Sequence, residues 1–126
     1  MARILIVEDD APTAELVKTV LESAGHTINS AGNGLEAIRL IKTDKPELVL
    51  MDVMMPVMNG FQALSILKND PETDQVPVVM LTARSGDLDM AHGWAEGVDF
   101  YLTKPFSPTE LITVVERILP TDGASA

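Results

Sequence analysis

The sequence predicts a single doubly wound α/β domain, and three observations support this prediction. Short runs with strand character alternate with amphipathic helical segments five times along the 126 residues. Most of these short runs are apolar at consecutive positions, which is typical of parallel strands covered by helices on both faces. The connections between them are short, as βα units require.

The first three βα units follow from hydrophobic spacing and from the residues that end each element. Strands are expected at residues 3–8, 26–30 and 47–51, and helices at 14–24, 34–43 and 61–68. Gly25 ends the first helix, in which Leu16, Val17, Val20 and Leu21 recur at helical spacing. In the second helix, Leu35, Ile38 and Ile41 share one face. The turn Asn59–Gly60 precedes the third helix.

The last two units are read in the same way. Strands are expected at residues 76–81 and 98–102, and helices at 88–96 and from 108 to Pro120. Pro77 stands at the start of the fourth strand, where a missing N–H does least harm. Ser107, Pro108 and Glu110 form the pattern of a capping box with proline at the first helical position. We therefore expect one domain over residues 1–120, with 121–126 a tail or the start of a linker.

Composition excludes several classes of function. The chain has no cysteine, which rules out disulfides, thiol catalysis and cysteine zinc sites. Its formal net charge of −10 disfavours binding to nucleic acid by this chain alone. No apolar run approaches the roughly 20 residues of a membrane span, and the N-terminus has no signal-peptide pattern. We therefore expect a cytoplasmic protein without a membrane partner.

Polar residues that suit phosphate chemistry follow four of the expected strands. Glu8-Asp9-Asp10 follow the first strand, Asp52 the third, Thr82 the fourth and Lys104 the fifth. In a parallel sheet these positions lie on one edge, where ligands of open α/β sheets bind.

The residue types at this edge favour a magnesium ion and a phosphoryl group. Carboxylates packed together repel one another unless a cation holds them, and Mg²⁺ prefers oxygen ligands. Lys104 can neutralise phosphate charge, and the Thr82 hydroxyl can donate to a phosphate oxygen. An aspartate carboxylate can accept a phosphoryl group covalently, and phosphoryl transfer depends mainly on positioning and charge stabilisation.

Four motifs in this order resemble the response-regulator receiver domain of two-component signalling, the CheY-like family. The resemblance covers the chain from Arg3 to about Leu119. The residues that carry it are Val7-Glu8-Asp9-Asp10, Leu50-Met51-Asp52-Val53-Met54-Met55-Pro56 with Asn59-Gly60, Leu81-Thr82-Ala83-Arg84, and Tyr101-Leu102-Thr103-Lys104-Pro105-Phe106. It implies a flavodoxin-like (βα)5 fold with strand order 2-1-3-4-5.

The resemblance also implies a role for each site residue. Asp52 is the phosphoacceptor, and Thr82 and Lys104 bind the phosphoryl group. The Mg²⁺ ligands are Asp9, Asp52, the backbone carbonyl of Met54 and Glu8, which acts partly through water. Tyr101 reorients when Thr82 moves toward the phosphate, and the Lys104–Pro105 bond is cis.

As implied partners, a histidine kinase or histidine phosphotransfer protein supplies the phosphoryl group, and a conformational change relays the signal to a downstream partner. The domain promotes its own phosphorylation and dephosphorylation and is not a metabolic enzyme in the usual sense.

A rival interpretation rests on the turn at residues 32–34. Gly32-Asn33-Gly34-Leu35-Glu36-Ala37 matches the dinucleotide pattern G-x-G-x-x-A, and Asp52 lies about twenty residues further on. However, that fingerprint belongs after the first strand of its unit, and this one follows the second. A nucleotide-binding α/β module remains the alternative function.

A possible partner face lies over the fourth helix, the fifth strand and the fifth helix. Met90, Trp94 and Phe100 stand there, whereas many DNA-binding regulators use charged residues in this region to dimerise. The hypothesis is an apolar contact with a partner, which could be a second copy of the chain. The alternative is that Trp94 and Phe100 simply cover the edge of the core.

Overall fold

The computed structural model describes residues 2–55, 57–82 and 97–119. Within these ranges the chain forms five strands and four helices. The strands are β1 (Arg3–Val7), β2 (Thr27–Ala31), β3 (Leu48–Asp52), β4 (Val78–Thr82) and β5 (Phe100–Thr103). The helices are α1 (Ala11–Ser23), α2 (Gly34–Asp44), α3 (Gly60–Lys68) and α5 (Pro108–Ile118). The helix expected at residues 88–96 and the tail at 121–126 lie outside the described residues.

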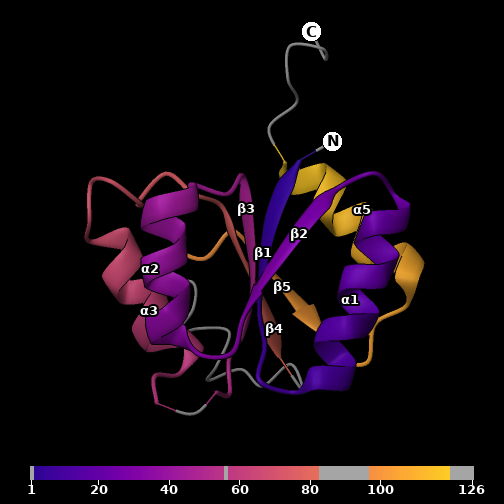
Figure 1. The fold of residues 1–126 in the computed structure, drawn as a ribbon, viewed down its shortest axis with the longest axis horizontal. Coiled ribbons are helices and arrows are strands. Elements are labelled where there is room, and N and C mark those ends of the chain that lie inside the picture. The colour runs from indigo at the N-terminus through magenta and orange to yellow at the C-terminus, as the bar shows by residue number, and fades with distance from the viewer. Residues whose placement is uncertain (1, 56, 83–96, 120–126) are drawn as a thin grey trace, which may run out of the picture.

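All five strands are parallel and pair in the order β2-β1-β3-β4-β5, which confirms the predicted doubly wound fold. In Figure 1 the sheet stands between two layers of helices, with α2 and α3 on one side and α1 and α5 on the other. The strand order reverses direction at β1, and β1 pairs with both β2 and β3. Ligands of such sheets bind beyond the carboxyl ends of the strands, near this point.

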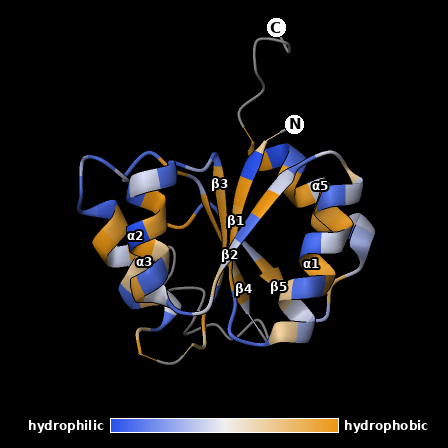
Figure 2. Ribbon diagram, viewed as in Figure 1, coloured by the Kyte–Doolittle hydropathy of each residue, from blue (hydrophilic) through white to orange (hydrophobic). Residues whose placement is uncertain are grey.

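Two hydrophobic cores hold the layers together, one on each face of the sheet. Residues of β1 alternate between them, because successive side chains of a strand point to opposite faces. Leu5 and Val7 pack in the core that contains Ala37, Ile41 and Leu64 of α2 and α3. Ile4 and Ile6 pack in the core that contains Val17, Leu21, Leu111 and Val115 of α1 and α5. Figure 2 shows hydrophobic strands in the middle and mixed colouring on the helices.

Some boundaries and faces differ from the prediction. α1 begins at Ala11, three residues before the predicted start, because Asp10 caps the helix and Pro12 fits its first turn. Leu16 and Leu35, predicted on the buried helical faces, are 53% and 58% exposed. The buried stripe of α1 instead runs through Val17 and Leu21, one turn apart on the side that faces the sheet.

No helix among the described residues has the length and apolar character needed to span a bilayer.

Candidate functional site

The parallel register brings the predicted polar residues to one edge of the sheet. Asp52, the last residue of β3, pairs with Leu81 of β4. Thr82, the last residue of β4, pairs with Thr103 of β5, and the N–H of Lys104 donates to the Thr82 carbonyl at 2.6 Å. Glu8 follows β1 directly and its N–H donates to the carbonyl of Ala31 at 3.0 Å. The predicted convergence of these strand ends is therefore confirmed.

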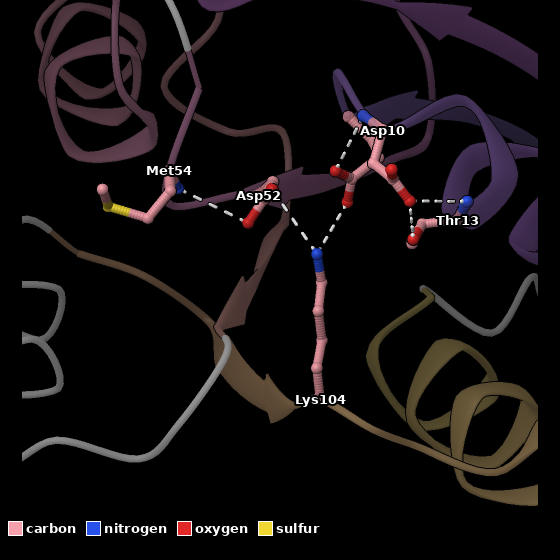
Figure 3. A network of polar contacts seen from close by, with 6 residues as sticks. Asp10, Thr13, Asp52, Met54 and Lys104 are labelled. Carbon is pink, nitrogen blue, oxygen red and sulfur yellow. Dashed lines mark hydrogen bonds and ion pairs between the residues drawn. The ribbon is translucent and has the colours of Figure 1, made fainter.

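The Lys104 side chain lies between two carboxylates that come from different strands. Its Nζ donates to Glu8 Oε1 at 2.9 Å and lies 3.4 Å from Asp52 Oδ2. Figure 3 shows the side chain extending from the end of β5 toward Asp52. The side chains of Glu8 and Asp52 are 1% and 9% exposed, whereas that of Lys104 is 25% exposed. The bond between Lys104 and Pro105 is cis, as the resemblance implied.

Burial and charge act together on the ionisation of this site. Burial raises the pKa of Glu8, and the hydrogen bond from Lys104 opposes that shift. Burial also works against the charged form of Lys104, but the neighbouring Glu8 and Asp52 carboxylates outweigh it and raise the pKa of Lys104. The ammonium therefore stays charged beside the carboxylates at neutral pH.

Three carboxylates lie close enough together to hold a cation. One oxygen each from Glu8, Asp9 and Asp52 lies within 4.8 Å of the others. Asp9 is exposed and faces the solvent side of the cluster, whereas Glu8 and Asp52 are buried. A set of oxygen donors with one open side suits Mg²⁺, which keeps several waters and takes few protein carboxylates.

The remaining predicted site residues lie at different depths. The Met54 N–H points to Asp52 Oδ1 at 3.4 Å, and the side chain, 73% exposed, extends away from the carboxylate (Figure 3). Thr82 is buried at the edge. Tyr101 is 8% exposed and packs in the core on the α2–α3 face. Phe100 is partly buried against the opposite core, and Met90 and Trp94 lie outside the described residues.

Hydrogen bonds within the loop after β1 support the buried Glu8 carboxylate and the start of α1. Glu8 Oε2 accepts from the N–H of Asp10 at 3.2 Å, which helps to fix the buried carboxylate. Asp10 in turn caps α1 and accepts from both the N–H and the hydroxyl of Thr13. These hydrogen bonds hold the pKa of Asp10 below its usual range. An acid three residues before threonine at a helix start is the sequence signal for such a cap.

Gly60 is a second supporting residue, and its role was not predicted. A Cβ at this position would lie 2.5 Å from the Asp52 carbonyl oxygen and 2.7 Å from Met80 Cε. The N–H of Gly60 donates to the Val53 carbonyl at 2.8 Å. The absence of a side chain thus lets α3 begin directly against the end of β3, behind the Asp52 carboxylate.

The glycines of the rival nucleotide pattern have a structural explanation. Gly34 begins α2, and a Cβ there would lie 3.0 Å from the Met58 carbonyl oxygen and 3.1 Å from Ala63 Cβ. It therefore permits close packing of α2 against α3. Asn33 caps α2 by accepting from the Glu36 N–H at 2.9 Å. The turn is accounted for by helix capping and packing.

A lysine held between acidic groups at the carboxyl edge of a 2-1-3-4-5 sheet is characteristic of a signal-receiving domain of the flavodoxin-like class. The chain belongs to the response regulator receiver domain family, whose family model matches residues 4–116.

Individual relatives agree with this assignment. Protein PilH of Pseudomonas aeruginosa is 39% identical over 119 residues, which cover 94% of this chain and 98% of that protein. The phosphate regulon transcriptional regulatory protein PhoB of Klebsiella pneumoniae is 41% identical over 117 residues, but these cover only 51% of its length. The chain therefore spans nearly all of the first relative and about half of the second.

Solved structures show the same architecture. The chemotaxis protein CheY4 of Vibrio cholerae superposes with a TM-score of 0.90 at 30% identity, over 94% of this chain and 99% of that one. The receiver domain of the sensor histidine kinase PA1611 from Pseudomonas aeruginosa has a TM-score of 0.86 at 28% identity, over 93% and 96%. That second structure holds a magnesium ion coordinated in its active site cleft.

Proposed function

We propose that this chain is a phosphorylation-controlled switch in which the Asp52 carboxylate accepts a phosphoryl group in a Mg²⁺-dependent reaction. The observation that supports this most directly is the pairing of Asp52 with the Lys104 ammonium, 3.4 Å apart, beside two further carboxylates. The donor is a phosphohistidine of a histidine kinase or of a histidine phosphotransfer protein, as membership of the family suggests.

The carboxylates of Glu8, Asp9 and Asp52, with the backbone carbonyl of Met54, would hold the Mg²⁺ ion. All of these donors are hard oxygens, and the three carboxylates already approach one another closely. When bound, the ion supplies positive charge that neutralises the charge on the phosphoryl oxygens during transfer. Burial of Glu8 favours this role, because a buried carboxylate gains more from a nearby cation than an exposed one does.

The chain's own residues carry the remaining chemistry. An Asp52 carboxylate oxygen attacks phosphorus in line, the P–N bond of the phosphohistidine breaks, and the imidazole leaves with the bonding electron pair. The product is an acyl phosphate on Asp52. The Lys104 ammonium and the Thr82 hydroxyl donate hydrogen bonds to the phosphoryl oxygens. Attack of water on phosphorus later releases inorganic phosphate and restores the carboxylate.

The new phosphoryl group then shifts a conformational equilibrium. Lys104 and Thr82 are drawn toward it, and Thr82 already shares a backbone hydrogen bond with Lys104. Movement of Thr82 opens space for Tyr101, which reorients, and a downstream partner binds the altered surface near β5, which includes Phe100. Met90 and Trp94 of the hypothesised partner face lie outside the described residues.

The test is covalent labelling with acetyl phosphate in the presence of Mg²⁺, followed by intact mass spectrometry. The wild-type chain should gain one phosphoryl group that hydroxylamine removes, as expected of an acyl phosphate. Asp52→Asn should gain none, whereas the matched variant Asp44→Asn, at the end of α2, should label like the wild type. Labelling that persists in Asp52→Asn, or that ignores removal of Mg²⁺ by EDTA, would contradict the proposal.

A further inference from the structure

The outer edge of β2 has backbone N–H and C=O groups that pair with no other described strand. β2 is a terminal strand of the sheet, and Figure 1 places it at the front between α2 and α1. Natural edge strands are usually protected by a charged residue, a proline or a β-bulge. β2, with the sequence Thr-Ile-Asn-Ser-Ala, has no charged residue or proline and pairs with β1 in unbroken register.

The direction of its backbone groups follows from the pairing with β1. The Thr27 N–H donates to the Ala2 carbonyl at 2.8 Å, and the Ala31 carbonyl accepts from the Glu8 N–H at 3.0 Å. In a parallel pair alternate residues bond to the neighbouring strand, so Thr27, Asn29 and Ala31 face β1. The N–H and C=O groups of Ile28 and Ser30 therefore point away from the sheet.

Just past β2, the next outward-facing N–H is already occupied by a side chain of the same chain. The N–H of Gly32 donates to Glu36 Oε1 at 2.9 Å, and Glu36 belongs to α2. At Ile28 and Ser30 the other described segments supply no such acceptor.

Two adjoining shallow hollows lie along this edge and together form the β2 groove. A hollow of about 440 Å³ has Ile28, Asn29 and Ser30 as its floor. Its walls are Lys18 of α1 and Glu36, Leu40 and Asp44 of α2. A second hollow of about 420 Å³ shares Lys18, Ser30 and Glu36 with the first and continues toward Asp9. The edge of β2 is therefore flanked by residues of α1 and α2.

The surroundings of the β2 groove favour a single peptide chain over a second copy of this protein. Helices α1 and α2 stand on both sides of β2, so the equally flanked β2 of a second copy cannot approach it closely. A single peptide chain can. The charged side chains along the two hollows are mostly acidic, with Glu8, Asp9, Glu15, Glu36 and Asp44 against Lys18. This charge favours a peptide that carries lysine or arginine.

We propose that the β2 edge binds an extended basic segment of a partner protein, which adds to the sheet as a sixth strand. Main-chain hydrogen bonds to Ile28 and Ser30 hold the segment, and its basic side chains contact the acidic walls. This binding does not require phosphorylation of Asp52.

The test uses a defined probe, the blocked peptide Lys-Val-Lys-Val-Lys-Val, titrated into the ¹⁵N-labelled chain. We expect saturable shifts of the Ile28 and Ser30 amides and slower exchange of both. At a peptide concentration ten times the Kd, exchange should slow about tenfold. Amides of β5, the other terminal strand, should not change.

Two controls separate strand addition from simple attraction of charge. A peptide of the same sequence with every backbone amide N-methylated keeps its charge but cannot donate the main-chain hydrogen bonds of strand addition, so it should bind at least about tenfold more weakly. Ser30→Pro removes an outward N–H and should abolish binding, whereas Ser30→Ala keeps that N–H and should bind like the wild type. If Ser30→Pro fails to fold, the N-methylated peptide decides. Equal binding of both peptides, or shifts confined to Asp9 and Asp52, would overturn the proposal.

Discussion

Replacing Gly60 with alanine tests how tightly α3 is packed behind the phosphoacceptor candidate. The added Cβ would lie 2.5 Å from the Asp52 carbonyl oxygen, 2.7 Å from Met80 Cε and 3.0 Å from Val53 Cα. Ordinary contact begins at 3.4 Å. The Met80 methyl can rotate away, but the other two atoms belong to the backbone at the end of β3 and can move only with the strand.

The expected cost follows from these contacts. Overpacking of a tight interior site costs about 1–3 kcal/mol, and two backbone clashes place Gly60→Ala in the upper half of that range. Alanine recovers up to about 1 kcal/mol of helix propensity, which leaves a net loss of about 1–2 kcal/mol. For a domain of this size that loss lowers Tm by roughly 3–10 °C.

Two other glycines provide a graded comparison. Gly34→Ala would meet neighbours at 3.0 to 3.2 Å and should be destabilised less, by about 1 kcal/mol. Gly32→Ala would meet nothing within 4 Å and should stay within about 0.5 kcal/mol of the wild type. Urea unfolding followed by far-UV circular dichroism measures all three. The steric reasoning is refuted if Gly60→Ala is as stable as Gly32→Ala.

Two further predictions concern a helix cap and a histidine. Ser107 Oγ accepts from the Glu110 N–H at 3.1 Å, so Ser107→Ala should cost about 1 kcal/mol in urea unfolding, whereas Thr109→Ala, exposed on the same turn, should cost less than about half of that. His26 Nδ1 accepts from the Ala2 N–H at 3.1 Å, and burial lowers the pKa of His26 below 6.5. Because the unfolded chain then binds a proton more readily, this contribution to stability is present above pH 6.5 and is lost as pH falls through the folded-state pKa. His26→Gln, which keeps an acceptor but does not titrate, should show a smaller loss of stability between pH 7.5 and 5; an equal loss in both proteins would argue against this role.

The sheet and the convergence of its polar ends could be predicted because both follow from local pattern. The apolar runs before Asp52 and Thr82 identify buried parallel strands, and parallel strands place their carboxyl ends together. The contact between Glu8 and Lys104 is different, because it joins residues 96 positions apart. Side-chain rotamers and burial determine whether Glu8 and Lys104 meet, and the spacing of residues in the sequence predicts neither.

The hydrophobic pattern of the sequence also could not predict which apolar residues would lie at the surface. Leu16 and Leu35 fit a helical stripe on spacing alone, yet both are exposed. The buried face of a helix depends on how the helix sits on the sheet, and a leucine one position off the buried stripe costs little to expose. Gly60 went unrecognised for a similar reason, since a close approach between backbones leaves no periodic signal.

The register of β3, β4 and β5 sets the relative positions of the polar residues at the ends of these strands. Asp52 pairs with Leu81, and Thr82 pairs with Thr103, inside a sheet whose central strands are fully buried. A slip of one residue would displace a strand end by about 3.3 Å and turn its side chains to the opposite face. Because both faces are packed, such a slip is strongly opposed. The packed interior of the sheet therefore fixes the spacing of Asp52 and Thr82, independently of the length of the loops that connect the strands.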